Sequence, residues 1–369
     1  MDMKDLDNNC ATCGSTTAKK CGKCCKVRYC CRDCQVKDWK NHKLNCNPFE
    51  IKESSGKGLG LFATCDLNIG DLIVRENPIL YFDAGHTSDD ILSDNYSIML
   101  PGSETFKEAY EALSREKKDL VLDLTQDSSS NEVEEEWKKA MRVFGTNCIA
   151  VDDDEAKNDA ALYATIARIN HSCSPNAEWC FMETVRADKE VRAIKRIKKG
   201  EEVVADYIAD NDFLTYLERK KILSMKWNFE CVCSICTSDH ATDDAMRTKL
   251  KRLHNEIPYY ARKFELKSAI NAALEKCRIL ENCEYLVSLL PIAYLELYET
   301  IVGAEQITGM IGLKPLPIFG QDYEHYREKA FEMMKKSKLA NKKEGYNKKM
   351  NRLAKSHGCF RDLGGGQPY

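Results

Sequence analysis

The stretch CATCGSTTAKKCGKCCKVRYCCRDCQVKDWKNHKLNC, residues 10–46, contains nine of the 19 cysteines of this 369-residue chain. A two-residue gap between cysteines lets both thiolates of a tight turn bind one ion, and tetrahedral zinc needs two such pairs. The ligand pairs follow one another as Cys10 and Cys13, Cys21 and Cys24, Cys30 and Cys34, and His42 and Cys46. Eight ligands in four pairs therefore predict two zinc ions.

The four pairs can be divided between two ions in more than one way. We prefer a cross-braced arrangement, in which the first and third pairs bind one ion and the second and fourth pairs bind the other. The extra thiols of Cys25 and Cys31 are adjacent to proposed ligands and could replace Cys24 or Cys30. Because the stretch has few apolar core residues, metal binding has to supply most of its folding energy, about 10 kcal/mol per site.

Length and composition predict two or three globular domains. The chain has a mass of 42.1 kDa, and its 43% hydrophobic and 31% charged residues are enough to form a buried core. Its most apolar stretch, residues 285–298, is 14 residues long, shorter than the roughly 20 residues that span a bilayer. We therefore expect no membrane segment.

The amino-terminal segment also bears on the compartment and on nucleic-acid binding. The first nine residues contain three aspartates and no apolar run, so they do not resemble a secretory signal. We expect a reducing compartment, the cytoplasm or the nucleus or both, in which cysteines remain available for metals. Residues 1–46 carry ten basic and five acidic side chains, and seven thiolates with two zinc ions leave about +2. Nucleic acid is a weaker alternative partner, because this charge is modest.

The segment after the cysteine cluster predicts a strand at residues 49–54 and a second strand at residues 72–76, with a turn at residues 68–71. Between them lies GKGLGLFA, residues 56–63, whose glycines would let the backbone approach a ligand closely. The spacing matches neither a phosphate-binding loop nor a dinucleotide fingerprint. A bare hairpin is an equally good interpretation of this glycine pattern alone.

Three further motifs follow along the chain. NHSCSPN, residues 170–176, comes after the helix-compatible segment 160–169 and could by itself be a capped turn. GEEVVADY, residues 200–207, predicts a turn and a strand that end on a tyrosine, which is ordinarily a half-buried core residue. WNFECVCSIC, residues 227–236, supplies three cysteines, one ligand fewer than tetrahedral zinc requires, so a distant residue must supply the fourth.

These elements, in this order, resemble the SET domain of protein lysine methyltransferases, and the cysteine cluster with Tyr29, Gln35 and Trp39 resembles the MYND zinc finger. Together they resemble the SMYD family across residues 10–236, in the arthropod-type order with the finger first. The resemblance implies an α+β multidomain protein. The expected parts are a MYND finger at 1–47, a SET-type β fold at 48–226 with a helical insert at about 84–144, a post-SET zinc motif at 227–240 and a helical region at 241–369.

Helical patterns support this division. Within the insert the clearest helical run is residues 106–124, and in the last third apolar residues recur at helical spacing over residues 266–280 and 286–301. Such stripes usually form a core. We therefore expect two amphipathic helices there.

The resemblance also implies roles for individual residues. A third structural zinc would be bound by Cys173 with Cys231, Cys233 and Cys236. Tyr207 matches the catalytic tyrosine beside the reacting methyl group. The residues expected to bind S-adenosylmethionine are Gly56, Lys57, Gly58, Leu59, Asn147, Asn170, His171 and Phe229.

The function implied is S-adenosylmethionine-dependent methylation of lysine in histone tails or other proteins, with the finger recruiting proline-rich peptides or co-regulators. Two positions depart from the family pattern. A small hydroxyl residue is often found where this chain has Ala167, and the family's Asn-x-Phe is Asn147-Cys148-Ile149 here. Both departures weaken the case for activity. Ala167, together with a carboxy-terminal region shorter than the resemblance leads us to expect, favours an alternative, a catalytically weak or inactive adaptor or transcriptional co-regulator.

Overall fold

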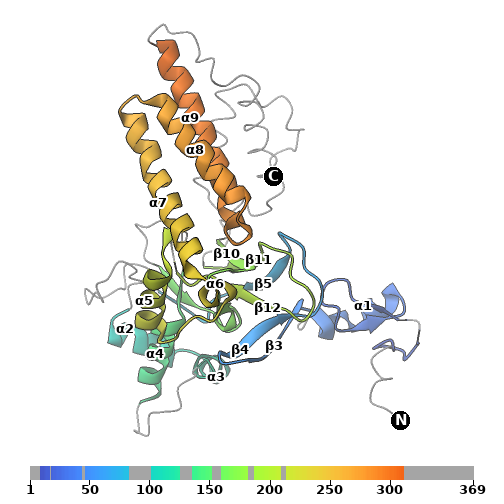
Figure 1. Ribbon diagram of the computed structural model, residues 1–369. Helices are drawn as coiled ribbons and strands as arrows, with labels where there is room; N and C mark the ends of the chain where they lie inside the picture. Colours follow the sequence, from blue (N-terminus) through green and yellow to red (C-terminus); the bar gives the residue numbers. More distant parts are fainter. Residues whose placement is uncertain are drawn as a thin grey trace. The chain divides into compact units, whose positions relative to one another are not determined.

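The computed structural model describes residues 9–16, 18–43, 46–82, 101–124, 135–151, 159–181, 187–208 and 213–310. The chain divides into two compact units, residues 1–205 and residues 206–369 (Figure 1).

The first unit begins with a small cysteine-rich module. Strands β1 (Lys19–Lys20) and β2 (Arg28–Tyr29) pair antiparallel, and helix α1 (Arg32–His42) follows. The buried apolar residues of this module are Ala18, Tyr29 and the five cysteines Cys10, Cys21, Cys24, Cys34 and Cys46. Such a core has almost no aliphatic surface to bury, so the module depends on its thiols for stability.

Three small sheets make up the rest of the β-structure in the described part of this unit. The first has the strand order β3 (Phe49–Ser54), β4 (Gly58–Ala63), β12 (Glu202–Ala205) and β9 (Asn170–His171). The second has the order β10 (Ala177–Phe181), β11 (Lys189–Ala193) and β5 (Leu72–Glu76). The third has the order β6 (Leu80–Phe82), β8 (Ala160–Leu162) and β7 (Ile149–Ala150). The predicted strands at 49–54 and 72–76 are confirmed.

The register of the first sheet positions the NHSCSPN motif. Strand β9 pairs parallel with β12, with Asn170 opposite Val204 and His171 opposite Ala205. The Asn176 side chain strengthens this junction, because its amide donates to the Glu202 carbonyl (2.8 Å) and accepts from the Val204 N–H (2.8 Å). The motif is therefore fixed to β12 at both ends.

The segment before this motif is not the helix that its composition suggests. Residues 160–162 form β8, fully buried between β6 and β7, and only Ile166–Arg168 form a short 3-10 helix, η4. The Glu76 carboxylate accepts from the N–H groups of Thr165 and Ile166 at 2.9–3.0 Å. Burial raises the pKa of Glu76, although these hydrogen bonds act in the opposite direction. Strand pairing and this cap override the local helix propensity.

The helical insert is confirmed in its described part, with a different division. The predicted run 106–124 consists of two helices, α2 (Ser103–Glu111) and α3 (Arg115–Leu122), because Ser114 starts a new helix by accepting from the Lys117 N–H. Helix α4 (Glu136–Asn147) completes the insert. The rings of Phe82, Phe106 and Phe144 form its aromatic core. Residues 83–100 and 125–134 of the insert lie outside the described residues.

The second unit is helical in its described part, as expected. It contains α5 (Tyr216–Trp227), α6 (Ser234–Thr237), α7 (His240–Arg262), α8 (Leu266–Glu281), η6 (Glu284–Leu289) and α9 (Leu290–Met310). Helices α7, α8 and α9 lie side by side around one apolar core (Figure 1). Helix α8 matches the first predicted amphipathic stripe, whereas the second stripe spans η6 and α9 with non-helical backbone at Leu286. Residues 311–369, with the lysine-rich end of the chain, lie outside the described residues.

A buried ion cluster ties together the helices of this unit. The Asp243 carboxylate accepts from Arg219 Nη2 at 3.2 Å and from Arg247 Nε at 2.9 Å, and both arginines are fully buried. The Tyr285 hydroxyl donates to the same carboxylate, and the pKa of Tyr285 is raised by burial and by this bond.

Within the described ranges, no helix is both long enough and apolar enough to cross a bilayer.

Candidate functional site

The amino-terminal module brings its eight predicted ligands into two groups. Cys10, Cys13, Cys30 and Cys34 form one, and Cys21, Cys24, His42 and Cys46 form the other, with all ligand atoms of a group within 4.8 Å of one another. These are the groups that cross-bracing predicts. The sulfur atoms of Cys13 and Cys30 lie 3.4 Å apart, and those of Cys21 and Cys46 lie 3.8 Å apart. Tetrahedral zinc with bonds of about 2.3 Å separates two sulfurs by roughly 3.8 Å, so both groups fit zinc.

The extra thiols lie outside both groups. Cys31 Sγ is 3.8 Å from Cys30 Sγ, but Cys31 is exposed and is not part of a four-ligand group. Cys25 is not part of either four-ligand group. The alternative in which these thiols replace Cys24 or Cys30 is therefore disfavoured. Cys24 is fully buried, as expected of a ligand in a closed structural site.

A third group of thiols also has the chemistry of a structural zinc site. The sulfur atoms of Cys173, Cys231, Cys233 and Cys236 lie within 4.8 Å of one another. Four thiolates with no open position match a structural rather than a catalytic zinc. The described residues thus contain three ligand groups, as many as the predicted zinc ions.

The glycine-rich segment and the NHSCSPN motif meet at β12. One carboxylate oxygen of Glu202 accepts a hydrogen bond from Lys57 Nζ at 3.2 Å, and the other accepts one from Asn170 Nδ2 at 2.7 Å. Asn170 Nδ2 also donates to the Leu59 carbonyl at 3.1 Å. Three of the residues predicted to bind the cofactor, Lys57, Leu59 and Asn170, therefore converge, although 111 positions separate Leu59 from Asn170.

Glycines shape this part of the first unit. Gly56 and Gly58 have φ of 72° and 73°, a left-handed conformation that favours glycine, and they flank Lys57 in the turn between β3 and β4. A Cβ at Gly60 would lie 2.6 Å from Glu202 Oε1 and 2.9 Å from Asn170 Nδ2. Only glycine at position 60 leaves room for the contact between Glu202 and Asn170.

Two predicted cofactor-binding residues have other contacts. His171 is buried, and its Nε2 lies 3.2 Å from Cys173 Sγ, so its ring contacts a thiol of the third zinc group. Asn147 ends α4, where its side-chain amide donates to the Val143 carbonyl at 2.9 Å. Their proposed roles toward the cofactor remain predictions.

In the second unit, Tyr207 and Phe229 belong to one aromatic cluster. The Tyr207 ring lies 5.2 Å from the Trp227 ring and 6.4 Å from the Phe229 ring, the latter edge to face. Asn228, which lies between Trp227 and Phe229 in the sequence, adopts a left-handed conformation with φ of 53°. This conformation ends α5 and turns the chain. Trp227 was not among the predicted site residues.

Sequence reasoning also missed Glu202 and Gly60. Each sits in a motif that we singled out, but residue type alone does not distinguish Glu202 from Glu201 or Gly60 from its neighbouring glycines. The alternation of strand β12, which buries Val203 and Ala205, places Glu202 and Val204 on the other face of the strand. That alternation is the signal that could have separated the two glutamates.

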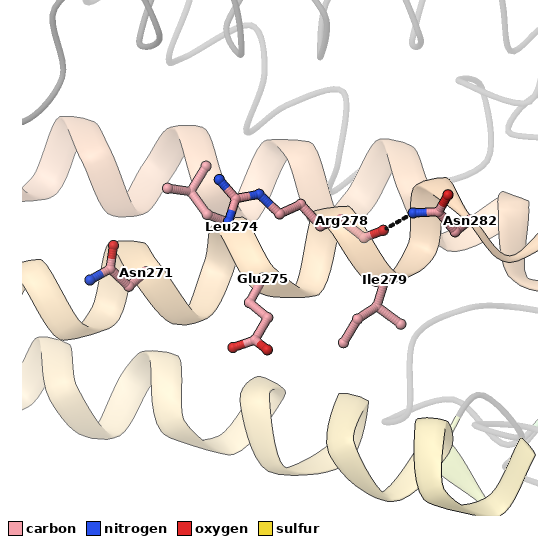
Figure 2. A pocket seen from close by; sticks show the side chains of 6 residues that line it. All are labelled: Asn271, Leu274, Glu275, Arg278, Ile279 and Asn282. Atoms are coloured by element: carbon pink, nitrogen blue, oxygen red, sulfur yellow. Dashed lines mark hydrogen bonds between the residues drawn. The ribbon is translucent and has the colours of Figure 1, made fainter. Parts of the chain in front are cut away.

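A surface hollow elsewhere carries none of the predicted site residues. It follows α8 and is lined by Asn271, Leu274, Glu275, Arg278, Ile279 and Asn282. Figure 2 shows these side chains along one helix, with Asn282 Nδ2 donating to the Arg278 carbonyl at 2.8 Å. The lining offers one acid and one base without a convergent polar centre, so it is not the candidate site.

The sequence of this chain is similar to those of several known proteins. N-lysine methyltransferase SMYD2 of Homo sapiens is 27% identical over 304 residues, which cover 76% of this chain and 65% of that protein. Histone-lysine N-methyltransferase ASHR1 of Arabidopsis thaliana is 29% identical over 243 residues, covering 63% of this chain and 47% of that protein. SET domain and MYND-type zinc finger protein 6 of Schizosaccharomyces pombe is 26% identical over 264 residues, covering 69% and 49%.

The chain thus spans between about half and two thirds of the length of these relatives. Two protein families match different parts of the chain. The MYND finger family matches residues 10–46, the module with two zinc-ligand groups, and the SET domain family matches residues 58–208, which include the convergence at Glu202. The chain therefore combines a SET domain with an amino-terminal MYND finger, as the SET and MYND domain-containing proteins do.

Proposed function

We propose that the protein is an S-adenosylmethionine-dependent protein lysine N-methyltransferase whose MYND finger recruits partner proteins. The observation that carries this proposal is the contact of Asn170 with Leu59 and Glu202 inside the SET domain. It joins the glycine-rich segment to the NHSCSPN motif, the two segments expected to bind the cofactor. Relatives named as lysine methyltransferases support the same reaction class.

The bound cofactor supplies a sulfonium-activated methyl group. The chain has to position it and to prepare the acceptor. In our proposal Gly56 and Gly58 bring backbone close to the cofactor, Asn170 contacts a polar end of it, and the Phe229 ring covers the adenine. His171 and Asn147 contribute further contacts.

The acceptor lysine needs a neutral amine, because the ammonium form has no lone pair. A lysine ammonium ordinarily has a pKa of about 10.4 in water, and an apolar channel lowers this pKa by desolvation. The rings of Trp227 and Phe229 beside Tyr207 are suited to line such a channel. Tyr207 is proposed to orient the amine through its hydroxyl and not to act as a base, since a phenol is ordinarily protonated at neutral pH. Holding the reacting atoms in line can contribute several kcal/mol.

One departure from the family pattern has a local explanation that does not require loss of activity. Ala167 is half-buried and packs against the apolar core of the helical insert, where its methyl group adds apolar contact. An inactive adaptor nevertheless remains the competing function, and one experiment separates the two.

Titration calorimetry with S-adenosylmethionine is expected to show binding to the zinc-loaded protein. Incubation with cofactor labelled in the methyl group is expected to label lysines of histone or non-histone peptides on an array. An adaptor with a degenerate pocket gives no binding heat and no label, and that result would reject the proposed activity. Binding heat without label on any peptide or on the protein itself would reject turnover while retaining the cofactor site.

We further propose that the finger binds proline-rich segments of partner proteins. Val36 and Trp39 lie three positions apart on α1 and are 64% and 45% exposed, so they offer an apolar face bordered by Lys37 and Lys40. Proline-rich segments dock on such aromatic faces because they are already extended and lose little entropy on binding. Histone tails or other lysine-bearing proteins in the cytoplasm or nucleus are the proposed substrates.

Replacing Trp39 with alanine should weaken binding of a proline-rich peptide at least about tenfold in a fluorescence titration. Ile51→Ala removes a similarly exposed apolar side chain from β3, 43% exposed, and should leave the peptide affinity unchanged. The zinc content of both variants is measured, because Trp39 contacts the ring of the ligand His42 at 5.8 Å. Equal affinities for the two variants would reject the proposed surface, and duplex DNA competing with the peptide in a salt-dependent manner would favour nucleic acid as its ligand.

A further inference from the structure

We propose that Glu202 is a positioning residue that fixes the side-chain amide of Asn170, so that Asn170 presents its oxygen and not its nitrogen to the cofactor. This inference rests on the proposed function and goes beyond it, because it specifies which groups of the cofactor Asn170 can contact. Glu202 itself need not touch the cofactor.

The amide orientation follows from the chemistry of its two neighbours. Asn170 lies 2.7 Å from a carboxylate oxygen of Glu202 and 3.1 Å from the Leu59 carbonyl oxygen. A carboxylate and a carbonyl can only accept hydrogen bonds, so the atom of Asn170 that faces both must be the NH₂ group. Both amide protons are thereby used, and only Oδ1 remains for a ligand.

The Glu202 carboxylate is itself held in place. The Lys57 ammonium lies 3.2 Å from its second oxygen, and the side chains are 29% and 17% exposed, respectively. The two groups form an ion pair, and a carboxylate has no proton that it could donate to Asn170. Strand pairing of Glu202 with Phe62 and the bond from Asn176 to the Glu202 carbonyl fix its backbone. The missing side chain at Gly60 leaves the space that the contact needs.

An oxygen that can only accept selects the cofactor group that meets it. In the proposed function Asn170 contacts an end of S-adenosylmethionine, and the N–H donors at its two ends are the ammonium of the amino-acid part and the exocyclic amine of the adenine, whereas the ribose hydroxyls lie between the ends. Its carboxylate cannot bind to this oxygen, because two acceptors repel each other and Glu202 adds a further negative charge nearby. A donor lost from the cofactor leaves Oδ1 without its partner, and that loss lowers affinity.

The test uses S-adenosylhomocysteine, which retains both donor groups, and two analogues that each lack one of them. One analogue has no α-amino group, and the other has hydrogen in place of the adenine amine. Dissociation constants are measured by calorimetry on the full zinc-loaded chain. We expect wild-type protein to bind one of the analogues at least about tenfold more weakly than S-adenosylhomocysteine.

Glu202→Gln should reduce this discrimination. A glutamine can donate as well as accept, so only the Leu59 carbonyl still requires the NH₂ group of Asn170 to face it, and the amide orientation is fixed less firmly. The ratio of the dissociation constant of the more weakly bound analogue to that of S-adenosylhomocysteine is therefore expected to fall toward one. A merely structural role would weaken the binding of all three ligands equally and leave this ratio unchanged. Glu202→Asp keeps an ionised acceptor on β12 and should restore part of the discrimination.

Glu50→Gln is the matched control. Glu50 pairs with Lys52 on β3 at the same 3.2 Å, but the pair is about half exposed, at 51% and 46%, and is not bonded to Asn170. This variant should keep the wild-type ratio.

The results separate the inference from the proposed function. Binding of S-adenosylhomocysteine by wild-type protein with no discrimination against either analogue overturns the inference alone, and this outcome needs no variant to fold. An unchanged ratio in a folded Glu202→Gln protein overturns the role of Glu202. Absence of any binding to wild-type protein overturns the proposed cofactor site and the inference with it.

Discussion

Removal of zinc is expected to unfold residues 10–46 while the SET sheets stay folded. The core of the finger is made of five cysteines with Ala18 and Tyr29, so apolar burial contributes little to its stability. Metal binding contributes about 10 kcal/mol per structural site, which exceeds the stability that so small a core can supply. Limited proteolysis of the full chain before and after chelation should show new cleavage within the finger.

Substitution of two adjacent cysteines allows a more specific test of this prediction. Cys24→Ser removes a fully buried ligand, whereas Cys25→Ser removes a neighbouring thiol that lies outside both ligand groups. Elemental analysis should give three zinc ions per chain for wild-type protein and for Cys25→Ser, and about one fewer for Cys24→Ser. Proteolysis should cleave the finger of Cys24→Ser readily and spare that of Cys25→Ser.

The opposite pattern would contradict the ligand assignment. Loss of zinc from Cys25→Ser with retention in Cys24→Ser would mean that the thiols exchange roles. One zinc or none in the wild-type chain would reject the three-site arrangement altogether.

The zinc ligands illustrate what a sequence can specify. A metal ion imposes short, fixed gaps between its ligands, so pairs such as Cys10 with Cys13 are visible in the linear order. The spacing leaves more than one division of the pairs open, and the structure has the two groups of the cross-braced division that we preferred. The exposed strand β3 was predicted with its observed bounds for a similar reason, because its boundaries are marked by local turn residues.

Segments whose conformation depends on distant partners were predicted less well. Residues 160–169 have a composition compatible with a helix, but β8 is fixed by pairing with β6 and β7. The run 106–124 has continuous helical character, yet the Ser114 cap starts a second helix within it. Propensity describes the isolated segment, and tertiary pairing or a single cap decides the outcome.

The candidate site shows the same limit at the level of single residues. Lys57, Leu59 and Asn170 were chosen through a family resemblance, and their convergence is a property of the sheet. Glu202, which contacts Lys57 and Asn170, lies 145 and 32 positions from them, and no local pattern marks it as their partner. Gly60 matters only because of the atoms that its missing side chain leaves in contact.

Substitution of Tyr207 by phenylalanine is expected to lower methyl-transfer turnover roughly 10²- to 10³-fold, on the scale of removing one preorganised hydrogen-bond donor from an active site. Phenylalanine keeps the ring that contacts Trp227 at 5.2 Å and Phe229 at 6.4 Å, so the aromatic cluster should persist. Only the hydroxyl that orients the acceptor amine is lost. The dissociation constant for S-adenosylmethionine should therefore change less than about twofold.

Tyr259→Phe is the matched control for this experiment. It removes a hydroxyl from an exposed tyrosine of α7 that accepts from Lys263 Nζ at 2.6 Å, and it should leave turnover unchanged. Single-turnover rates with labelled cofactor, measured beside calorimetric affinities, distinguish an effect on chemistry from an effect on binding. Equal turnover in wild-type protein and Tyr207→Phe would remove Tyr207 from the catalytic role. A parallel loss of cofactor affinity and turnover would instead make Tyr207 part of the cofactor pocket, because an interaction made equally before and during methyl transfer does not accelerate the chemical step.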